Sequence, residues 1–461
     1  MKPVALLVAA SLLGAPLAVA AQSPDAAAPP AAATAPAPAP PLELSLDEAV
    51  ARGLAANLGA LVAAGELEEA RGERTRARSA LLPRIDGSLG ESRQVINLQA
   101  YGLPVAPGES PLVGPFDVYD IRIHLAENLL DLAAGSRSQA ARERLDASRL
   151  TYAAVRDRVA AGVIDLYLGV LSEEARIDAA RAQVATAETT ERSAEHQQQA
   201  GTAAGIDVLR AEVRLAAERQ GLIDVENRAA KRRLELAQAI GAPLDRPLEL
   251  TDRIGFTAGT LQPLAAALAE AKASRPDLAA ARATVAAAES AVAAARRERL
   301  PSLEIHGDYG KIGPQPQSAL VTYTIAGGLM VPLFEGGRIV GDVAAARGRL
   351  TQAQAQLDDL ERQVERDVRS AYLDVDAAAR QVTVADQARD LAAQQLQQAR
   401  DRFASGVADD LEVVAAQQEV AAANERYVSS LYAFHRAKVA LALSLGAAEK
   451  SASAMLKGEN R

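Results

Sequence analysis

The sequence of 461 residues contains no cysteine and no tryptophan, and only 3% of its residues are aromatic. Without cysteine, the chain has no disulfide framework, zinc knuckle, iron–sulfur cluster or thiol chemistry. It contains only four histidines, so we expect neither a histidine-rich metal site nor any cofactor. The shortage of aromatic rings argues against stacking on single-stranded nucleic acid, and the net charge of −9 disfavours nucleic acid as a partner.

The first residues have the composition of a targeting segment. Lys2 precedes an apolar run from Val4 to Val19, which ends in small residues. A short basic region, a short apolar core and small residues at its end predict a secretory signal peptide over residues 1–21. Residues 22–41 are rich in proline and alanine and predict a flexible linker. No later stretch holds about 18 uninterrupted apolar residues, so no membrane-spanning helix is predicted.

The rest of the chain contains an internal two-fold repeat. At one constant offset, Tyr167 aligns with Tyr372 and Leu236 aligns with Leu441. Each half predicts a helix, two strands, a very long helix, a turn and a further long helix. The predicted division is a first repeat at 42–241, a connecting segment at 242–262, a second repeat at 263–447 and a C-terminal tail at 448–461.

Two very long helices are the clearest local prediction. Residues 134–200 and 337–404 contain no proline, and at ~1.5 Å per residue each helix would be on the order of 100 Å long. In the second of them, apolar residues recur at intervals of three and four, which is typical of a coiled-coil seam. Glycine-containing turns follow both helices and predict antiparallel helical hairpins over 134–240 and 337–445.

Four short segments alternate apolar and polar residues. For example, Ile85, Gly87 and Leu89 alternate with Asp86 and Ser88. Alternation of period two with one polar face is the pattern of a membrane β-barrel, although it also fits a half-buried sheet in a soluble protein. The export signal, and helices too long to cover a sheet, favour the barrel. The predicted strands cover about 84–95, 118–129, 302–311 and 321–332, with external loops at Ile96–Phe116 and Lys311–Leu320.

Four strands cannot close a barrel in lipid, where an open sheet edge is forbidden. Several copies of the chain must therefore contribute strands. Two copies would give about eight strands and little lumen, whereas three would give about twelve and leave a pore. The sequence therefore predicts an oligomer and favours a homotrimer.

With these features together, the chain resembles the outer membrane factor family, the TolC-like efflux and export channels. The resemblance is carried by Val331–Arg338, by its first-half counterpart Asn128–Gly135, and by the paired Tyr167 and Tyr372. It covers the chain from about residue 43 to residue 447. Each motif is weak alone, but their duplicated order is specific. The turns from barrel to tunnel are expected at Asp131, Gly135, Pro332, Phe334, Gly336 and Gly337.

The resemblance implies a fold that is mainly α with membrane β. Long hairpins of three chains would form a periplasmic α-barrel below a twelve-stranded outer-membrane β-barrel that contacts lipid. The homotrimer would dock on a periplasmic adaptor (a membrane fusion protein) and, through it, on an inner-membrane pump or ABC transporter. The channel would be a passive export conduit for efflux or type I secretion in a Gram-negative bacterium, and which substrate it exports stays open.

The resemblance also implies a gate at the helical tips. The position of the family's gate tyrosine is Phe403 here, and that of its arginine is Ala408, so much of the polar constellation is absent. Threefold symmetry would repeat each lumen-facing carboxylate as a ring that favours cations, while helix capping is the alternative role for Asp409 and Asp410. The candidates for gating or selectivity are Asp207, Phe403, Asp409, Asp410 and Glu412, and those for adaptor docking are Gly201, Thr202, Gly205, Gly406 and Val407.

Two other classes of protein are less consistent with the sequence. An enzyme is not predicted, because the sequence has no nucleophile elbow, HExxH, P-loop or dinucleotide fingerprint. A periplasmic coiled-coil adaptor, which also contains a helical hairpin, is the main alternative. An adaptor would have one hairpin flanked by compact β modules, whereas this chain predicts two hairpins and two amphipathic strand pairs.

Overall fold

The computed structural model describes residues 40–106, 108–201, 204–257, 261–405, 407 and 410–451. The predicted signal peptide, nearly all of the predicted linker and most of the predicted tail lie outside these ranges. So do Thr202, Gly406, Ala408 and Asp409 among the residues discussed above. The chain divides into two units, Met1–Pro40 and Pro41–Arg461, and every element described below belongs to the second.

The same sequence of element types occurs twice along the described chain. The helices are α1 (Leu46–Ala56), α2 (Leu58–Ser79), α3 (Leu132–Gln199), α4 (Gly205–Ala239), α5 (Leu264–Ser274), α6 (Pro276–Arg297), α7 (Arg338–Ala404) and α8 (Asp410–Ser444). The strands are β1 (Leu42–Leu44), β2 (Arg84–Asn97), β3 (Leu112–Leu130), β4 (Leu248–Leu250), β5 (Ser302–Gly313) and β6 (Leu320–Met330). Short 3-10 helices occupy Leu98–Tyr101 and Pro316–Ser318. Lengths recur with the order: α3 and α7 have 68 and 67 residues, and α4 and α8 have 35 each.

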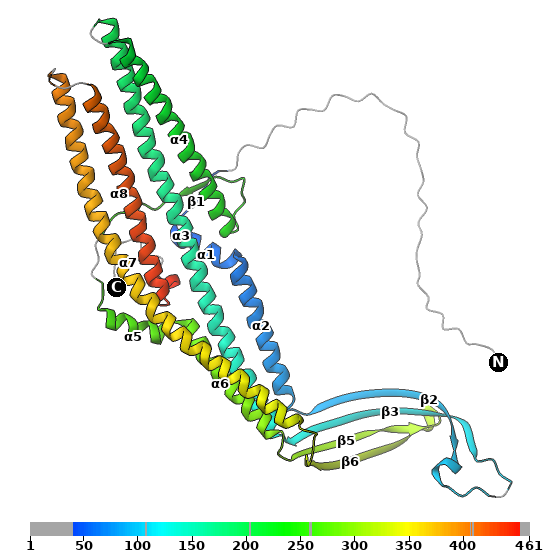
Figure 1. Ribbon diagram of the computed structural model, residues 1–461. Coiled ribbons are helices and arrows are strands. Elements are labelled where there is room, and N and C mark those ends of the chain that lie inside the picture. The colour runs from blue at the N-terminus through cyan, green and yellow to red at the C-terminus, as the bar shows by residue number, and fades with distance from the viewer. Residues whose placement is uncertain are drawn as a thin grey trace, which may run out of the picture. The chain divides into compact units, whose positions relative to one another are not determined.

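The four long helices form two antiparallel hairpins. α3 lies along α4 and α7 lies along α8, while α3 also lies along α8 (Figure 1). Nearer the sheet, the shorter helices α2 and α6 lie along α3, and α6 also lies along α7. Buried positions on α7 are small, for example Val364, Val368 and Val382, which are fully buried. Small side chains at these positions let neighbouring helix axes approach closely.

A break divides the first helical segment of each half, whereas the sequence analysis expected one helix there. Between α1 and α2, the side chain of Asn57 caps α2 by accepting a hydrogen bond from the backbone N–H of Gly59 (2.9 Å). Between α5 and α6, Pro276 begins the second helix and disfavours helical backbone at Arg275, which is extended. The expectation of a single helix was therefore wrong in both halves.

One of these helices also differs from the sequence prediction about membrane spans. α6 is long and apolar enough to cross a membrane by length and composition, with a mean hydropathy of 1.2. The bent pair of α1 and α2 passes the same test when taken together. Alanine accounts for much of the apolar content of α6, and the helix lies along α3 and α7. Its composition is therefore explained by packing between helices.

The largest apolar cluster lies where β1, α1 and β4 meet the middle of α3. β1 and β4 form a parallel pair that links the start of the described chain to the connecting segment. Tyr167 is fully buried there, and its hydroxyl lies 2.8 Å from Asp252 Oδ2 and 3.0 Å from the carbonyl of Leu44, both acceptors. The same carboxylate accepts the backbone N–H of Leu46 (2.7 Å). Burial, and next Asp252, raise the pKa of Tyr167, so its hydroxyl stays a neutral donor.

The connecting segment is also held on the second hairpin. The hydroxyl of Tyr372 donates to the carbonyl of Gln262 (3.0 Å). His435 Nε2 lies 3.0 Å from the carbonyl of Gly255, so it is the donor in this pair. Burial lowers the pKa of His435 to about 4, so the imidazole is neutral near pH 7. The two tyrosines that align in the repeat therefore each hold a segment lying across the long helices.

The second sheet is antiparallel, with the strand order β2-β3-β5-β6. Two hairpins, β2–β3 and β5–β6, are joined by pairing of β3 with β5. β3 begins at Leu112 rather than near 118, so the predicted loop Ile96–Phe116 was partly wrong. Within the described chain, β2 and β6 each pair on one side only, which leaves two open edges.

Candidate functional site

One face of the four-stranded sheet is apolar and exposed. The pairing register places Ile85, Leu125, Gly307 and Ile325 in one row across the four strands. Ile325 has an exposed fraction of 79%. This surface, called the apolar face below, comprises Ile85, Leu89, Ile121, Ile123, Leu125, Tyr309, Val321, Tyr323, Ile325 and Leu329. A continuous exposed surface of this kind requires lipid or a partner to cover it.

The opposite surface, called the polar face below, carries charged and hydrogen-bonding side chains. Its central row consists of Asp86, His124, Asp308 and Thr324. Arg122 lies on the same face of β3, two residues before His124. It forms an ion pair with Asp308 of the central row and another, of 3.1 Å, with Asp120. No group of three or more metal-ligating side chains is placed to hold a metal ion in the part of the chain that the structure describes. The two faces thus separate apolar from charged side chains, as in a membrane barrel wall.

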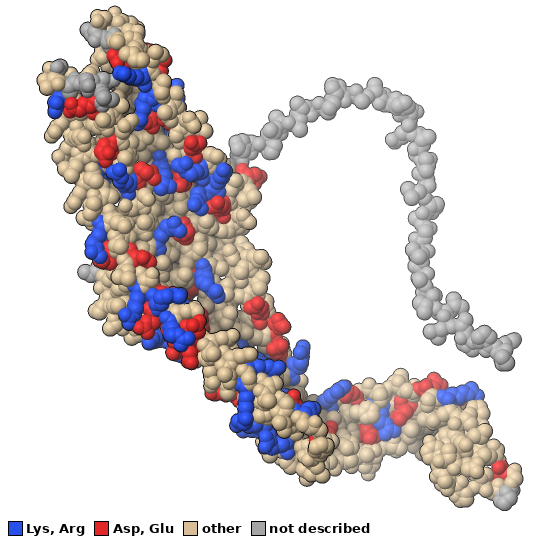
Figure 2. All heavy atoms as spheres, in the orientation of Figure 1, with Lys and Arg blue, Asp and Glu red and all other residues tan. Residues whose placement is uncertain are grey.

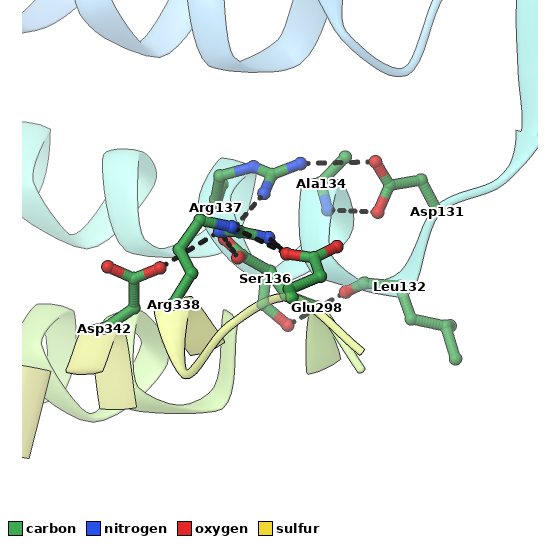
Figure 3. A network of polar contacts seen from close by, with 9 residues as sticks. Asp131, Leu132, Ala134, Ser136, Arg137, Glu298, Arg338 and Asp342 are labelled. Carbon is green, nitrogen blue, oxygen red and sulfur yellow. Dashed lines mark hydrogen bonds and ion pairs between the residues drawn. The ribbon is translucent and has the colours of Figure 1, made fainter. Parts of the chain in front are cut away.

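A network of ion pairs lies where the strands continue into the long helices (Figure 3). Asp131 caps α3 by accepting the N–H of Ala134 (2.8 Å), and its other oxygen pairs with Arg137 (3.2 Å). Glu298, just after α6, accepts from Arg137 (3.3 Å) and from Arg338 at the start of α7 (2.7 Å). One carboxylate therefore links the start of α3 to the start of α7.

The other predicted turn residues lie around this network. Gly336 and Gly337 have φ values of 60° and 89°, which favour glycine, and they lead into α7. Phe334 is 90% exposed, and it lies with Pro332 in the non-helical segment that follows β6. Gly135 differs from the expectation, because it lies inside the first turn of α3 without a positive φ. In the first half, Asp131 alone separates the strand β3 from the helix α3.

At the tip of the first hairpin, the structure favours a capping role for Asp207. Gly201 has a φ of 75° just after α3, and Gly205 is the first residue of α4. The Asp207 carboxylate accepts the backbone N–H of Ala204 (3.2 Å) and pairs with Arg210 (3.3 Å). These contacts satisfy a helix N-terminus and partly neutralise the carboxylate.

At the tip of the second hairpin, Phe403 is partly buried against Val413 and Ala416 of α8. At the position where the resemblance places the family's gate tyrosine, the aromatic ring of Phe403 therefore packs inside its own hairpin. Glu412 on α8 lies 3.4 Å from Arg402 on α7. Val407 is 70% exposed between the helices, and Asp410 opens α8.

Comparison with known proteins decides the family. A protein-family model described as outer membrane efflux protein matches residues 52–242 and 267–447. The chain belongs to the outer membrane efflux protein family. It is therefore an outer-membrane efflux channel with a large periplasmic portion, which confirms the predicted function and location and decides against the periplasmic adaptor. The family and the fold are those of channel proteins rather than enzymes.

The alignments with individual relatives extend over most of this chain. It is 26% identical to the pyoverdine export outer membrane protein OpmQ of Pseudomonas aeruginosa, over 87% of this chain and 85% of OpmQ. It is 24% identical to the alkaline protease secretion protein AprF of the same species, over 80% of this chain and 77% of AprF. Among solved structures, the CmeC outer membrane channel of Campylobacter jejuni has a TM-score of 0.76 at 18% identity and 90% coverage of both chains. VceC of Vibrio cholerae has a TM-score of 0.73 at 20% identity, over 87% of this chain and 96% of VceC.

The sequence analysis missed two residues that organise this channel protein. Glu298 bridges two arginines, and Asp252 holds the hydroxyl of Tyr167 and the backbone of Leu46. Neither residue lies in a recognisable motif, and acidic residues are common along the chain. Only their partners, which lie far away in the sequence, distinguish them from the other acidic residues.

Replacement of Glu298 by Gln is expected to lower the temperature at which the purified protein unfolds. The change removes the charge shared by Arg137 and Arg338, so the link between the starts of α3 and α7 becomes weaker. The measurement is thermal unfolding of the purified protein, followed by circular dichroism. Glu68→Gln is the matched control, because Glu68 pairs with Arg71 within α2 and is well exposed. Equal shifts for the two variants would contradict the role of Glu298.

Proposed function

We propose that three copies of this chain form one passive export channel, with their sheets closed into a twelve-stranded outer-membrane barrel. The open sheet carries this proposal: both of its edges lack a partner within the described chain, and its apolar face is exposed. An open edge is not tolerated in lipid, because unpaired backbone groups there cost several kcal/mol each. Pairing of β6 of one copy with β2 of the next removes every open edge when the ring closes.

The helices also support contact between one side of each copy and the opposite side of the next. α4 and α7 lie at the two sides of the layer of long helices, next to α3 and α8 respectively (Figure 1). Both carry large exposed apolar side chains, and a contact between unlike surfaces that closes on itself forms a ring. On α4 these are Leu209, Val213, Ile223 and Leu234, and on α7 they are Val340, Leu373, Val384 and Leu391.

The domain organisation proposed for the channel follows the repeat. Residues 42–241 and 263–447 each supply one strand hairpin and one helical hairpin, and the two segments matched by the family model support this division. Residues 242–262 form a belt that joins the repeats, supported by the contacts of Tyr167 and Tyr372. A signal peptide at 1–21 and a linker at 22–41 precede them, and a tail follows at 448–461.

The helical tips are the proposed contact with a periplasmic adaptor, and through it with an inner-membrane pump or ABC transporter. The energy for export comes from that pump, because the chain shows no motif for nucleotide binding. The cargo of the two named relatives differs, a pyoverdine for one and an alkaline protease for the other. We therefore propose that the pump and the adaptor select the cargo for a general conduit.

The test of this proposal is the oligomeric state of the purified protein in lipid nanodiscs. The expected result is a mass of three chains, with the protein retained in the outer-membrane pellet after a high-salt wash. A monomer or dimer in nanodiscs would overturn the trimeric barrel. Release of the protein by salt would overturn its insertion in the membrane.

Ion selectivity tests the proposed entrance at the second tip. Glu412→Gln is expected to lower the preference for cations by about twofold, because three copies repeat each carboxylate in a ring. Arg402→Ala is expected to raise it by a similar factor, since Arg402 lies 3.4 Å from Glu412 and offsets its charge. The measurement is the reversal potential in planar bilayers under a salt gradient. A shift of the reversal potential in the same direction for both variants would contradict a lumenal position of Glu412.

A further inference from the structure

The polar face of the sheet becomes apolar at the end of the sheet farthest from the long helices. Asp120, Ile312 and Leu320 pair in one row across β3, β5 and β6. Because alternate residues share a face, Val118 and Phe116 continue the polar face along β3. Four apolar side chains on this surface, Phe116, Val118, Ile312 and Leu320, thus lie level with Asp120 or beyond it. Leu320 is 75% exposed in the single chain.

The apolar face carries charged side chains at the same end of the sheet. Arg93 on β2 lies opposite Asp117 on β3, and the two form an ion pair of 3.8 Å. Glu91 precedes them on the same face of β2, and Lys311 on β5 pairs with Ile121 and Val321. Charged side chains on the outside mark the level at which a barrel leaves the lipid. The apolar residues on the inside therefore lie at the outer mouth.

The part of the β2–β3 hairpin beyond these rows has almost no charge. The sequence contains no lysine or arginine from residue 94 to residue 121, and Figure 2 shows this end of the molecule largely without charged side chains. Val95, Tyr101 and Leu112 are exposed there. Anionic lipid headgroups attract lysine and arginine, so this surface suits the equivalent surfaces of the other copies better than a headgroup layer.

The dimensions allow the three hairpins to meet. Strands about 4.8 Å apart and tilted by about 40° give a twelve-stranded barrel a radius of roughly 12 Å. The β2–β3 hairpin continues past the last pairs of β5 by the pairs from Ser92–Val118 to Asn97–Leu112. About six residues at ~3.3 Å each span roughly 20 Å. A register shift between Gln94 and Ile96 bends this part of the hairpin away from the line of the sheet.

We propose that Phe116, Val118, Ile312 and Leu320 of three copies form an apolar collar that narrows the outer mouth of the channel. The collar contacts the same residues of the neighbouring copies and slows the passage of water, ions and polar solutes from outside. It rests on the proposed trimeric barrel. The helical tips and the collar are then two barriers in series, one at each end of the conduit, and the collar protects the cell when the tips are open.

Because the chain has no cysteine, single cysteines can report on the collar in intact cells. Thr324→Cys places a thiol on the polar face beneath the collar, and Ile325→Cys places one on the adjacent apolar face. Ser318→Cys lies in the turn between β5 and β6, outside the collar. The probe is a charged maleimide too large for general porins, added from outside. We expect rapid labelling at Ser318→Cys, labelling about tenfold slower at Thr324→Cys, and none at Ile325→Cys.

Opening of the collar supplies the second half of the experiment. Ile312→Ser combined with Leu320→Ser is expected to bring labelling of Thr324→Cys to within about twofold of Ser318→Cys, because a polar ring stays hydrated. Ala326→Ser is the matched control on the same face, below the collar, and it should leave the labelling slow. All variants are compared at equal amounts in the outer-membrane fraction.

The outcomes separate the collar from the barrel on which it rests. Labelling of Thr324→Cys as fast as that of Ser318→Cys, with Ile325→Cys protected, would overturn the collar and leave the barrel in place. Slow labelling of Thr324→Cys that the double serine change does not accelerate would overturn the assignment of the collar residues. Rapid labelling of Ile325→Cys would overturn the barrel itself.

Discussion

Ile325→Arg is expected to prevent stable assembly in the outer membrane. Ile325 lies in the middle of the apolar face, next to Gly307 and in the same row as Leu125. An arginine on the lipid side of a barrel near the bilayer midplane costs about 2–4 kcal/mol. In the proposed trimer, three copies would raise this cost to roughly 6–12 kcal/mol per channel. The measurement is the amount of protein in the outer-membrane fraction, which should fall at least tenfold.

The neighbouring residue supplies the control. Thr324→Arg introduces the same side chain one position earlier, on the polar face near Asp308. Because the new charge would face water in the lumen of the proposed barrel, the amount of protein in the outer membrane should change by less than about twofold. An equal loss for the two variants would contradict the assignment of the faces. A greater loss for Thr324→Arg would reverse it.

Gly446→Val is expected to be the most damaging single change in the helical part. Gly446 ends α8 with a φ of 72°, and the N–H of Ala447 bonds back to the carbonyl of Ala442 (2.9 Å). A Cβ atom at Gly446 would lie 2.9 Å from the Cα of Arg275. Backbone strain and overlap together cost roughly 2–5 kcal/mol. Urea unfolding of the purified protein measures the change.

Another glycine of the same chain tests this explanation. Gly348 lies within α7, has no positive φ and would have no atom within 4 Å of an added Cβ. Gly348→Ala should therefore stabilise the protein by about 0.5–1 kcal/mol, because alanine favours the helix. If Gly446→Val unfolded at the same urea concentration as the unchanged protein, the turn after α8 would not need glycine.

The glycines that follow α4 and α8 have the same structural role in the two halves. Gly241 and Gly446 align at the same offset as Leu236 and Leu441. In the structure, a Cβ at Gly241 would lie 2.5 Å from the Cβ of Ala56, at the break between α1 and α2. Gly446 approaches the break between α5 and α6 in the same way. Each glycine follows the end of a long helix and leaves space for the break between two shorter helices. The close approach to this break explains why glycine stands at both positions.

Periodicity along the chain predicted the types of element. The intervals of three and four predicted the helices, and the alternation of period two predicted the strands; β2 begins at Arg84 and β6 at Leu320, close to the predicted positions. These patterns are local, because each one follows from the geometry of a single helix or strand. The helix break at Asn57 and the register shift between Gln94 and Ile96 were missed, since neither has a periodic signature.

The candidate site was predicted less well than the fold. Asp131, Gly336 and Gly337 lie between the strands and the long helices, whereas Gly135 lies within α3. Phe403 and Glu412 do lie together near the second tip, but the first packs inside its own hairpin and the second lies beside Arg402. A resemblance transfers positions along a chain, whereas a role depends on the partners that surround each side chain.

The sequence by itself determined that this chain is exported, contains two similar halves and is built from long helices and amphipathic strands. Those properties depend on composition, periodicity and order, which are local or repeated along the chain. Only the tertiary structure decided that β3 pairs with β5, that Asp252 holds Tyr167, and that Glu298 joins the two long helices. The partners in these contacts lie far apart in the sequence, and only the folded backbone brings them within reach of a hydrogen bond.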